Sequence, residues 1–404
     1  MPFLRPARVV SPAQALVPIV SKHRGPIFAS FFQAGFECSS HRRQDGVRLD
    51  LIRATSHDKH VLRDYRQCRQ LGFETVRDGL RWHLIEKAPG NYDWSSWQPA
   101  LEAAERTGLQ VIWDLFHYGS PDHVDPATED FADRFTEFAL AALDFRQSIT
   151  RQPPVVCPLN EINFMSWAVE VGYFPRCGPR QKGWFKRQLV GTAIKAARAI
   201  RDRFPDAAIV WAEPLVHIAP RSHRRAEVRA AEILRLGQFE SYDWITGRTE
   251  PELGGDPSLA DLIGLNFYPH NQWYREGPTI PMGHHEHRPL ADMLMEVSER
   301  YGKPIFLSET GAEGSGRASW LHYVCSEVRE AMARGARVEG ICWYPITAYP
   351  GWDNSRHADA GLLSPVTADG GRHVDARLYE ELEAQRAAFA YIPQERRSVN
   401  GARR

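Results

Sequence analysis

The chain has few lysines and no excess of charge of either sign. Only seven of its 50 basic residues are lysines, and none of them ends a predicted β-strand. This argues against an enzyme that forms a Schiff base with a strand-end lysine. The 50 basic residues are balanced by 50 acidic residues, so the formal net charge is zero. We therefore expect no nucleic-acid partner and no polybasic membrane anchor.

The sequence also has little cysteine and no long apolar segment. Its six cysteines contain no CxxC pair, and a chain of 404 residues can build a large core without disulfides. No run of about 18 apolar residues is present, so we expect no membrane span. Pro2, Pro6 and Pro12 interrupt the first residues, so no secretory signal is predicted and we expect a cytoplasmic protein. None of these features indicates an oligomeric state.

Eight strand candidates are present, each followed by a turn cluster and usually by an amphipathic helical pattern. The predicted strands are Ile27–Gln33, Thr75–Leu80, Val111–His117, Val155–Asn160, Ala208–Glu213, Leu262–Tyr268, Pro304–Glu309 and Gly340–Pro345. Predicted helices include Asp58–Leu71, Trp97–Thr107, Ser319–Arg334 and one with an apolar stripe of Phe131, Phe135, Phe138 and Phe145. Alternation of strands and helices predicts a parallel sheet.

The number of repeats decides between an open and a closed sheet. Eight repeats favour a closed (β/α)8 barrel, the α/β fold known as the TIM barrel. An open dinucleotide-binding sheet is disfavoured because no GxGxxG turn follows the first strand, and no cofactor is expected. No break in composition divides the chain. Residues 26–390 are therefore predicted to form one domain, with an N-terminal extension at 1–25 and a disordered tail at 391–404.

Two glutamates stand at the ends of the fourth and seventh predicted strands. Glu161 follows the run Val155–Asn160, and Glu309 ends the run Pro304–Glu309. In a closed barrel the C-terminal strand ends form the active-site face, so both side chains are expected there. A retaining glycosidase needs two carboxyl groups roughly 5–5.5 Å apart, one to attack the anomeric carbon and one to protonate the leaving oxygen. Either glutamate alone is more often a salt-bridge partner than a catalytic residue, so the pair and its neighbours carry the hypothesis.

These strand ends resemble those of clan A glycoside hydrolases, which are retaining enzymes on a (β/α)8 barrel. Within the clan, the sequence is most similar to family 1, the β-glucosidase family, from about Phe28 to Pro365. The matching motifs are Phe36-Glu37, Glu74-Thr75-Val76-Arg77, His117, Leu159-Asn160-Glu161, Asn266-Phe267-Tyr268, Ser308-Glu309-Thr310-Gly311, Trp343 and Trp352-Asp353-Asn354. The resemblance implies a carbohydrate substrate, with Glu309 as nucleophile and Glu161 as acid/base.

The other matched residues have supporting roles. Arg77 is a permanent cation that we expect to keep Glu309 ionised and to lower its pKa. Tyr268 is expected to donate a hydrogen bond to the same carboxylate, and Asn160 to bind a sugar 2-hydroxyl. Glu161 is expected to have a raised pKa and to begin the cycle protonated. The residues predicted to bind the substrate are Glu37, His117, Glu213, Trp343, Trp352, Asp353 and Arg356.

The sequence departs from family 1 among the residues that bind sugar. Gly35 stands where the family has a glutamine on the first strand, and Gln33 and Glu37 are the neighbouring candidates to replace it. Arg356 and His357 stand where the family has a glutamate and a tryptophan. A cation at this point favours an anionic substituent on the sugar, and a surface arginine facing solvent is the alternative.

Structural alternatives remain open for several of these residues. Arg77 is also consistent with a structural ion pair, His117 with a core histidine, and Trp343 with barrel filling. Glu213 is included among the substrate-binding residues because it is an acidic residue at the end of the fifth predicted strand, and it is also consistent with a structural role. The histidine-rich segment 283–287 lacks the spacing of a helix-borne zinc site, so no metal is expected. Two alternatives to hydrolysis are transfer of the sugar to an acceptor sugar and a non-catalytic carbohydrate-binding barrel.

Overall fold

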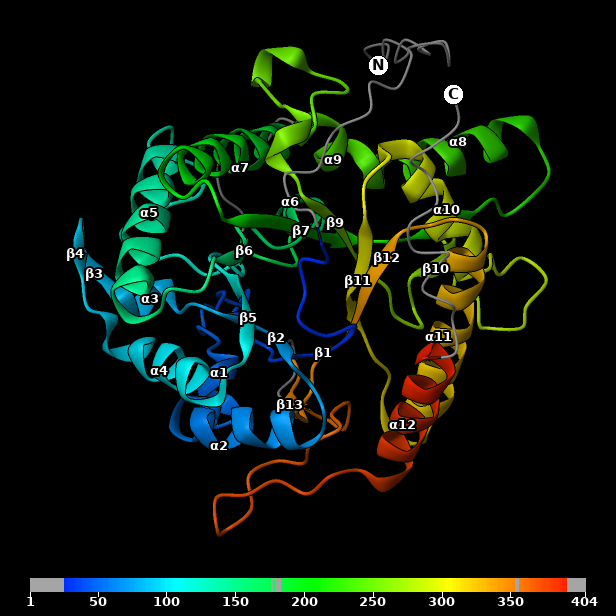
Figure 1. Cartoon of the computed structure of the whole chain (residues 1–404). Coiled ribbons are helices and arrows are strands. Elements are labelled where there is room, and N and C mark those ends of the chain that lie inside the picture. The colour runs from blue at the N-terminus through cyan, green and yellow to red at the C-terminus, as the bar shows by residue number, and fades with distance from the viewer. Residues whose placement is uncertain (1–24, 176–177, 179–182, 353–355, 391–404) are drawn as a thin grey trace, which may run out of the picture.

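Eight parallel strands form a closed barrel in the computed structural model (Figure 1), which describes residues 25–175, 178, 183–352 and 356–390. The barrel strands, in order around the barrel, are β1 (Phe32–Gly35), β2 (Thr75–Gly79), β5 (Gln110–Asp114), β6 (Val155–Cys157), β7 (Ala208–Pro214), β9 (Leu262–Asn266), β11 (Ile305–Thr310) and β12 (Val338–Trp343). Pairing of β12 with β1 closes the circle. The predicted (β/α)8 barrel is confirmed. Residues 1–24 of the predicted extension and the predicted tail lie outside the described ranges.

Helices surround the barrel, as Figure 1 shows. They are α1 (Leu51–Ala54), α2 (His57–Gln70), α3 (Trp82–Ile85), α4 (Gln98–Thr107), α5 (Phe131–Ile149), α6 (Ile162–Val171), α7 (Trp184–Arg203), α8 (Arg225–Leu236), α9 (Glu240–Ile245), α10 (Leu290–Tyr301), α11 (Arg317–Ala333) and α12 (Ala376–Ala390). Short strand pairs outside the barrel are β3 (Glu86–Ala88) with β4 (Asn91–Tyr92), β8 (His217–Ala219) with β10 (Gln272–Tyr274), and β13 (Tyr349–Pro350) with β14 (His357–Ala358).

The first barrel strand begins later than its apolar run predicts. Of the run Ile27–Gln33, only Phe32 and Gln33 belong to β1. Phe28 instead packs into the barrel interior, where its ring centroid lies 4.9 Å from that of Phe306. Burial of a large aromatic ring explains why this segment fills the barrel rather than extending the sheet.

The layer between the barrel and its helices is rich in aromatic rings. Phe131, Phe135 and Phe138 of α5 are fully buried, as the apolar stripe predicted. The ring of Phe138 stacks on that of Trp82, with centroids 4.6 Å apart. Each buried phenylalanine contributes roughly 1.5–3 kcal/mol relative to exposure, so this face fixes α5 against the sheet.

A buried network of charged groups ties β2 to α2 and to the segment after β14. His57 lies between two carboxylates, with Nδ1 2.7 Å from Asp64 and Nε2 3.0 Å from Asp78. Arg372 donates to both oxygens of Asp64, at 2.7 and 3.0 Å, and the Tyr65 hydroxyl donates to Asp78 at 2.7 Å. Because Asp78 belongs to β2, these bonds fix the outer side of a strand whose inner side faces the barrel interior.

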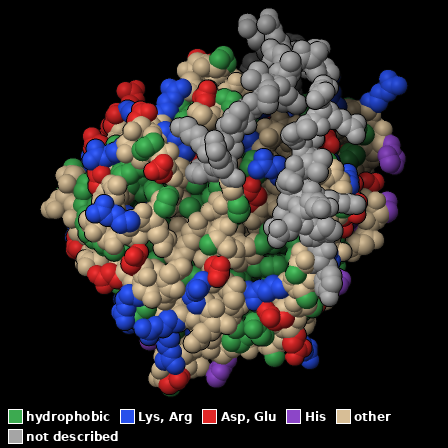
Figure 2. All heavy atoms as spheres, viewed as in Figure 1, with side chains coloured by type: hydrophobic (Ala, Val, Ile, Leu, Met, Phe, Trp, Pro, Cys, Tyr) green, Lys and Arg blue, Asp and Glu red, His purple; other side chains and the backbone are tan. Residues whose placement is uncertain are grey.

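The face of the molecule shown in Figure 2 carries mixed charges. On the face shown in Figure 2, acidic and basic side chains are interspersed, with no continuous area of one sign. A nucleic-acid backbone needs a basic track, which this face does not offer. Within the described ranges, no helix has both the length and the apolar character that crossing a membrane requires.

Candidate active site

Glu309 lies on β11, with its carboxylate in the barrel interior. Arg77 donates from Nη1 to Oε1 at 2.7 Å, and the Tyr268 hydroxyl donates to Oε2 at 2.8 Å. Glu309 is 5% exposed and Arg77 is 1% exposed, so water screens this ion pair very little. The structure thus brings together three residues from separate strand ends, and each carboxylate oxygen of Glu309 is held by one donor.

Arg77 uses all five of its N–H groups. Nε and Nη2 bind the two oxygens of Asp114 at 3.0 and 2.8 Å. Nη2 also donates to Asn160 Oδ1 at 2.7 Å, and Nη1 donates to the Ser308 carbonyl at 3.1 Å as well as to Glu309. The planar guanidinium group of arginine has five N–H donors in fixed directions, which match these five acceptor contacts. The ammonium group of lysine has three donors and does not match them.

Glu161 directly precedes α6 and is also buried. Its backbone φ of 46° lies in the left-handed region, which is uncommon for a residue with a side chain. Asn266 donates from Nδ2 to Oε1 at 2.8 Å, and the Tyr118 hydroxyl donates to Oε2. The Ser308 hydroxyl donates to Asn266 Oδ1 at 2.6 Å, which orients the Asn266 amide group toward Glu161.

Burial is the main influence on both carboxyl groups. It raises the pKa of Glu161, although the hydrogen bonds from Tyr118 and Asn266 oppose the shift. It also raises the pKa of Glu309 to about 7, with Arg77 opposing the shift and the charge of Glu161 adding to it. The expected lowering by Arg77 is present, but burial outweighs it, so the net direction differs from the prediction. Because Glu309 is bonded to a cation and Glu161 to two neutral donors, we expect Glu309 to ionise first.

Asn160, His117 and Glu37 form the wall beside Arg77. Asn160 Nδ2 lies 3.1 Å from His117 Nε2, and His117 Nδ1 lies 2.9 Å from Asp114 Oδ2. His117 Nε2 accepts from Asn160, so its hydrogen resides on Nδ1 and is donated to Asp114. Glu37 Oε1 lies 3.9 Å from His117 Nε2. The predicted bond from Asn160 to a sugar hydroxyl stays a prediction, and it would replace one of the bonds that Asn160 makes here.

Tyr344 occupies the space beside Gly35. A Cβ atom on Gly35 would lie 2.1 Å from Cδ2 of Tyr344, so only glycine leaves room for this ring. The ring lies 5.4 Å from the guanidinium carbon of Arg77, and therefore faces the site. Gln33 and Glu37 were the two candidates to replace the family's glutamine at Gly35. Glu37 reaches the site, whereas Gln33 lies deeper in the barrel.

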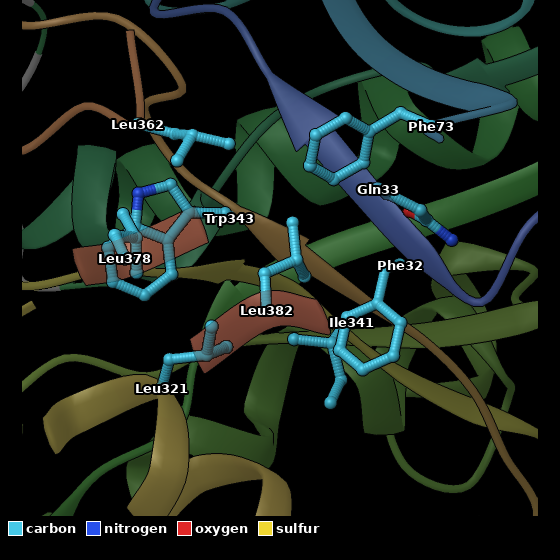
Figure 3. Close-up of a pocket in the computed structure, with 9 residues that line it drawn as sticks. All are labelled: Phe32, Gln33, Phe73, Leu321, Ile341, Trp343, Leu362, Leu378 and Leu382. Carbon is cyan, nitrogen blue, oxygen red and sulfur yellow. The ribbon is translucent and has the colours of Figure 1, made fainter. Parts of the chain in front are cut away.

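Trp343 does not reach the site. Figure 3 shows its ring in a small cavity between the barrel and α12, beside Leu378 and Leu382. Its Nε1 donates to the Ala360 carbonyl at 3.0 Å. Side chains alternate along β12, so Trp343 faces outward and the next residue faces the barrel interior. The predicted sugar-stacking role of Trp343 is therefore wrong, and so is the alternative of barrel filling, because the ring packs between the barrel and α12.

Glu213 also points away from the site. It faces outward from β7, on the same side as Trp211, and its Oε2 accepts from the backbone N–H of Asn163 at 3.0 Å. Burial raises its pKa to about 8, while the bonds from Asn163 and Ser241 oppose the shift. The Asn163 N–H is one of the free donors at the start of α6, so Glu213 caps this helix instead of lining a sugar pocket.

Trp352, in the loop after β12, lies beside the ring of Tyr118. The Trp352 ring centroid lies 5.6 Å from that of Tyr118. Arg356 has a side chain that is 59% exposed and binds both oxygens of Glu313 at 2.8 Å, so its charge is paired at the surface. The predicted sugar-binding residue Asp353 lies outside the described ranges.

One cluster in the described part of the chain has metal-ligand spacing, and it is not the histidine-rich segment 283–287. The ligand atoms of Cys38, Asp114 and His117 lie within 4.8 Å of one another. Asp114 is already bound through both oxygens by Arg77, and a divalent cation here would lie beside the guanidinium group. We therefore assign these residues to the hydrogen-bond network of Arg77.

Comparison with solved structures identifies the fold. A family 1 β-glucosidase from Thermotoga maritima matches with a TM-score of 0.69 at 14% identity, covering 93% of this chain and 100% of that chain. The GH1 β-glucosidase from Exiguobacterium antarcticum B7 matches with a TM-score of 0.70 at 13% identity, covering 90% and 98%. The fold is that of family 1 β-glucosidases. No protein-family model and no curated protein matches the sequence.

Within this β-glucosidase fold, sequence reasoning missed four site residues. Asp114 and Asn266 each end an apolar strand, so the rule that identified Glu309 also applies to them. Tyr118 directly follows the third predicted strand and Tyr344 lies near the end of the eighth, but sequence reasoning assigned neither to the site. Only their surroundings in three dimensions identify them.

Proposed function

We propose that the protein is a retaining β-glycosidase that hydrolyses a β-linked glycoside. The supporting observation is the network around Arg77, which binds Glu309 directly and reaches Glu161 through Asn160 and Tyr118. Both carboxyl groups are buried beside the C-terminal ends of barrel strands, where enzymes of this fold carry out their chemistry. Solved relatives of the same fold include β-glucosidase complexes with deoxynojirimycin and with glucoimidazole.

In the first half of the proposed reaction, Glu309 attacks the anomeric carbon and the bond to the leaving oxygen breaks. The proton of Glu161 passes to that oxygen. Burial raises the pKa of Glu161, which favours the protonated form that this step needs. Arg77 and Tyr268 orient the attacking carboxylate by donating one hydrogen bond to each of its oxygens. Each oxygen has a second lone pair, so one remains available to attack the anomeric carbon.

In the second half, Glu161 accepts a proton from water while the water oxygen attacks the anomeric carbon. The bond between that carbon and Glu309 breaks, and the sugar leaves with its original anomeric configuration. Loss of the proton in the first step leaves Glu161 ionised, so the same residue serves as acid and then as base. An acceptor sugar in place of water would give transfer instead of hydrolysis.

The test is a comparison of Glu309→Ala and Glu161→Ala on activated aryl β-glycosides. Each variant is expected to lose about 10³-fold or more in kcat. Azide should rescue Glu309→Ala with formation of the α-glycosyl azide, because the anion enters from the side of the missing carboxylate. It should rescue Glu161→Ala with formation of the β-glycosyl azide, because the anion then replaces water in the second step.

Glu213→Gln is the matched control. Glu213 is another buried glutamate, but it caps α6 from outside the site, and glutamine keeps an acceptor for the Asn163 N–H. We expect this variant to keep its activity. Full activity of Glu309→Ala on any substrate that the wild-type enzyme hydrolyses would contradict the proposed function.

A further inference from the structure

The two donors to Glu161 are both uncharged, and one of them is a tyrosine hydroxyl. Asn266 binds Oε1 at 2.8 Å and Tyr118 binds Oε2. Tyr118 is buried, and its hydroxyl also lies 3.0 Å from Asn160 Nδ2. The Tyr118 oxygen therefore stands between an amide donor and the carboxyl group of the proposed acid/base.

The direction of the Tyr118 O–H bond follows from Arg77. Arg77 has only donors, so the Asn160 atom 2.7 Å from its Nη2 must be the amide oxygen. The Asn160 nitrogen then faces Tyr118 and donates to its oxygen. With that lone pair occupied, the hydroxyl hydrogen of Tyr118 is directed toward Glu161 Oε2. The same arginine that binds Glu309 thus orients a donor on the other carboxyl group.

The backbone and the ring of Tyr118 are both held in one conformation. Its φ of 67° lies in the left-handed region, which is unfavourable for a residue with a Cβ atom. Such a conformation persists where the surroundings enforce it, and it is concentrated at functional sites. Five aromatic rings surround the Tyr118 ring at centroid distances of 4.7–6.1 Å: His41, His117, Phe164, Phe174 and Trp352.

We propose that Tyr118 is a positioning residue that acts through Glu161. Its hydroxyl fixes the orientation of the carboxyl group and stabilises the ionised form, which the second half of the reaction uses. Tyr118 keeps its own proton throughout. As Glu161 gives its proton to the leaving oxygen, the bond from Tyr118 becomes a charge-assisted hydrogen bond and strengthens. This inference rests on the proposed function, because it assigns Glu161 as the acid/base.

Tyr118→Phe tests the inference, since it keeps the ring and removes the hydroxyl. Loss of a donor to the ionised form raises the pKa of Glu161. The alkaline limb of the pH profile of kcat/KM should therefore shift to higher pH by about one unit. The second half of the reaction needs ionised Glu161. For a 2,4-dinitrophenyl β-glycoside, whose leaving group needs little protonation, kcat should therefore fall about tenfold while kcat/KM changes less.

A second variant and two controls separate this effect from a general structural one. Difluorotyrosine at position 118 is a stronger donor of nearly the same size, and should move the alkaline limb down. Tyr268→Phe removes the corresponding donor from Glu309, and should move the acidic limb instead. Tyr242→Phe removes a buried hydroxyl bonded to the Gly264 carbonyl, outside the site, and should move neither limb.

An alkaline limb that stays in place in both Tyr118 variants would overturn the inference, as would an equal loss of kcat and kcat/KM with an unchanged pH profile. These results are distinguishable from failure of the proposed function. If Glu161→Ala and Glu309→Ala lose activity while the Tyr118 variants keep the wild-type profile, only the role of Tyr118 fails. If the two alanine variants stay active, the proposed function fails.

Discussion

Replacing Arg77 with lysine keeps the charge but removes the geometry that joins the two carboxyl groups. Arg77 makes five hydrogen bonds to buried acceptors, and lysine has three N–H groups, so at least two bonds are lost. A hydrogen bond to a charged group is worth about 1.5–3 kcal/mol, which predicts a loss of at least about 3 kcal/mol in the free energy of unfolding.

The activity of Arg77→Lys should fall as well, because Glu309 and Asn160 lose their fixed positions. A displacement of about 1 Å in a catalytic group costs on the order of 10²-fold in rate, so we expect at least that loss in kcat/KM. The assay combines kcat/KM on an aryl β-glycoside with urea unfolding of the same preparation.

Arg372→Lys is the matched control for this prediction. Arg372 is a second buried arginine that binds both oxygens of an aspartate, Asp64, but it lies outside the site. We expect Arg372→Lys to lose stability and to keep kcat/KM. If Arg77→Lys is folded and retains kcat/KM at the level of the control, Arg77 does not organise the site and the reasoning is refuted.

Two further predictions concern pH and substrate charge. Burial lowers the pKa of His57, but Asp78 and Asp64 raise it more, to about 9, so its stabilisation is complete below about pH 6.5 and is lost as the pH rises through 9. Urea unfolding should therefore show a decrease of about 3 kcal/mol between pH 6.5 and 10 in the wild-type protein and a much smaller one in His57→Gln; equal slopes would contradict this. Glu313→Gln releases Arg356 from an exposed ion pair worth at most about 1 kcal/mol, so kcat/KM for carboxylated or phosphorylated β-glycosides should rise up to about fivefold relative to neutral ones. No change in that ratio would show that Arg356 does not approach the sugar.

The parts of the site that could be predicted from sequence are those fixed by strand ends. Glu309 lies near the C-terminal end of an apolar run and Arg77 lies in the middle of β2, and a closed parallel barrel brings the two strands to one active-site face. Tyr268 and Glu161 follow their strands by a few residues and reach the same space. Strand positions singled out the two glutamates before any contact was known, and the resemblance to clan A added Arg77 and Tyr268.

It was much harder to predict whether a strand residue faces the barrel interior or the outer helices. Strands of a (β/α)8 barrel are buried on both faces, so no alternation of polar and apolar residues shows which side chains face the barrel interior. Trp343 was assigned to the pocket through the resemblance and Glu213 because it ends a strand, whereas both face the outer helices. Tyr344 was missed because its ring reaches the site only where Gly35 leaves room for it. Tyr118 was missed because a left-handed turn sets the direction of its side chain.

The central claim is that Glu309 forms a covalent bond with the sugar. Incubation with 2-deoxy-2-fluoro β-glycosides that carry an activated leaving group should trap this intermediate, because fluorine at C2 slows the second step more than the activated first step. Peptide mapping of the inactivated protein should find the sugar on Glu309, and Glu309→Ala should remain unlabelled. A label on another residue, or full hydrolytic activity on the matching glycosides with no label, would contradict the account.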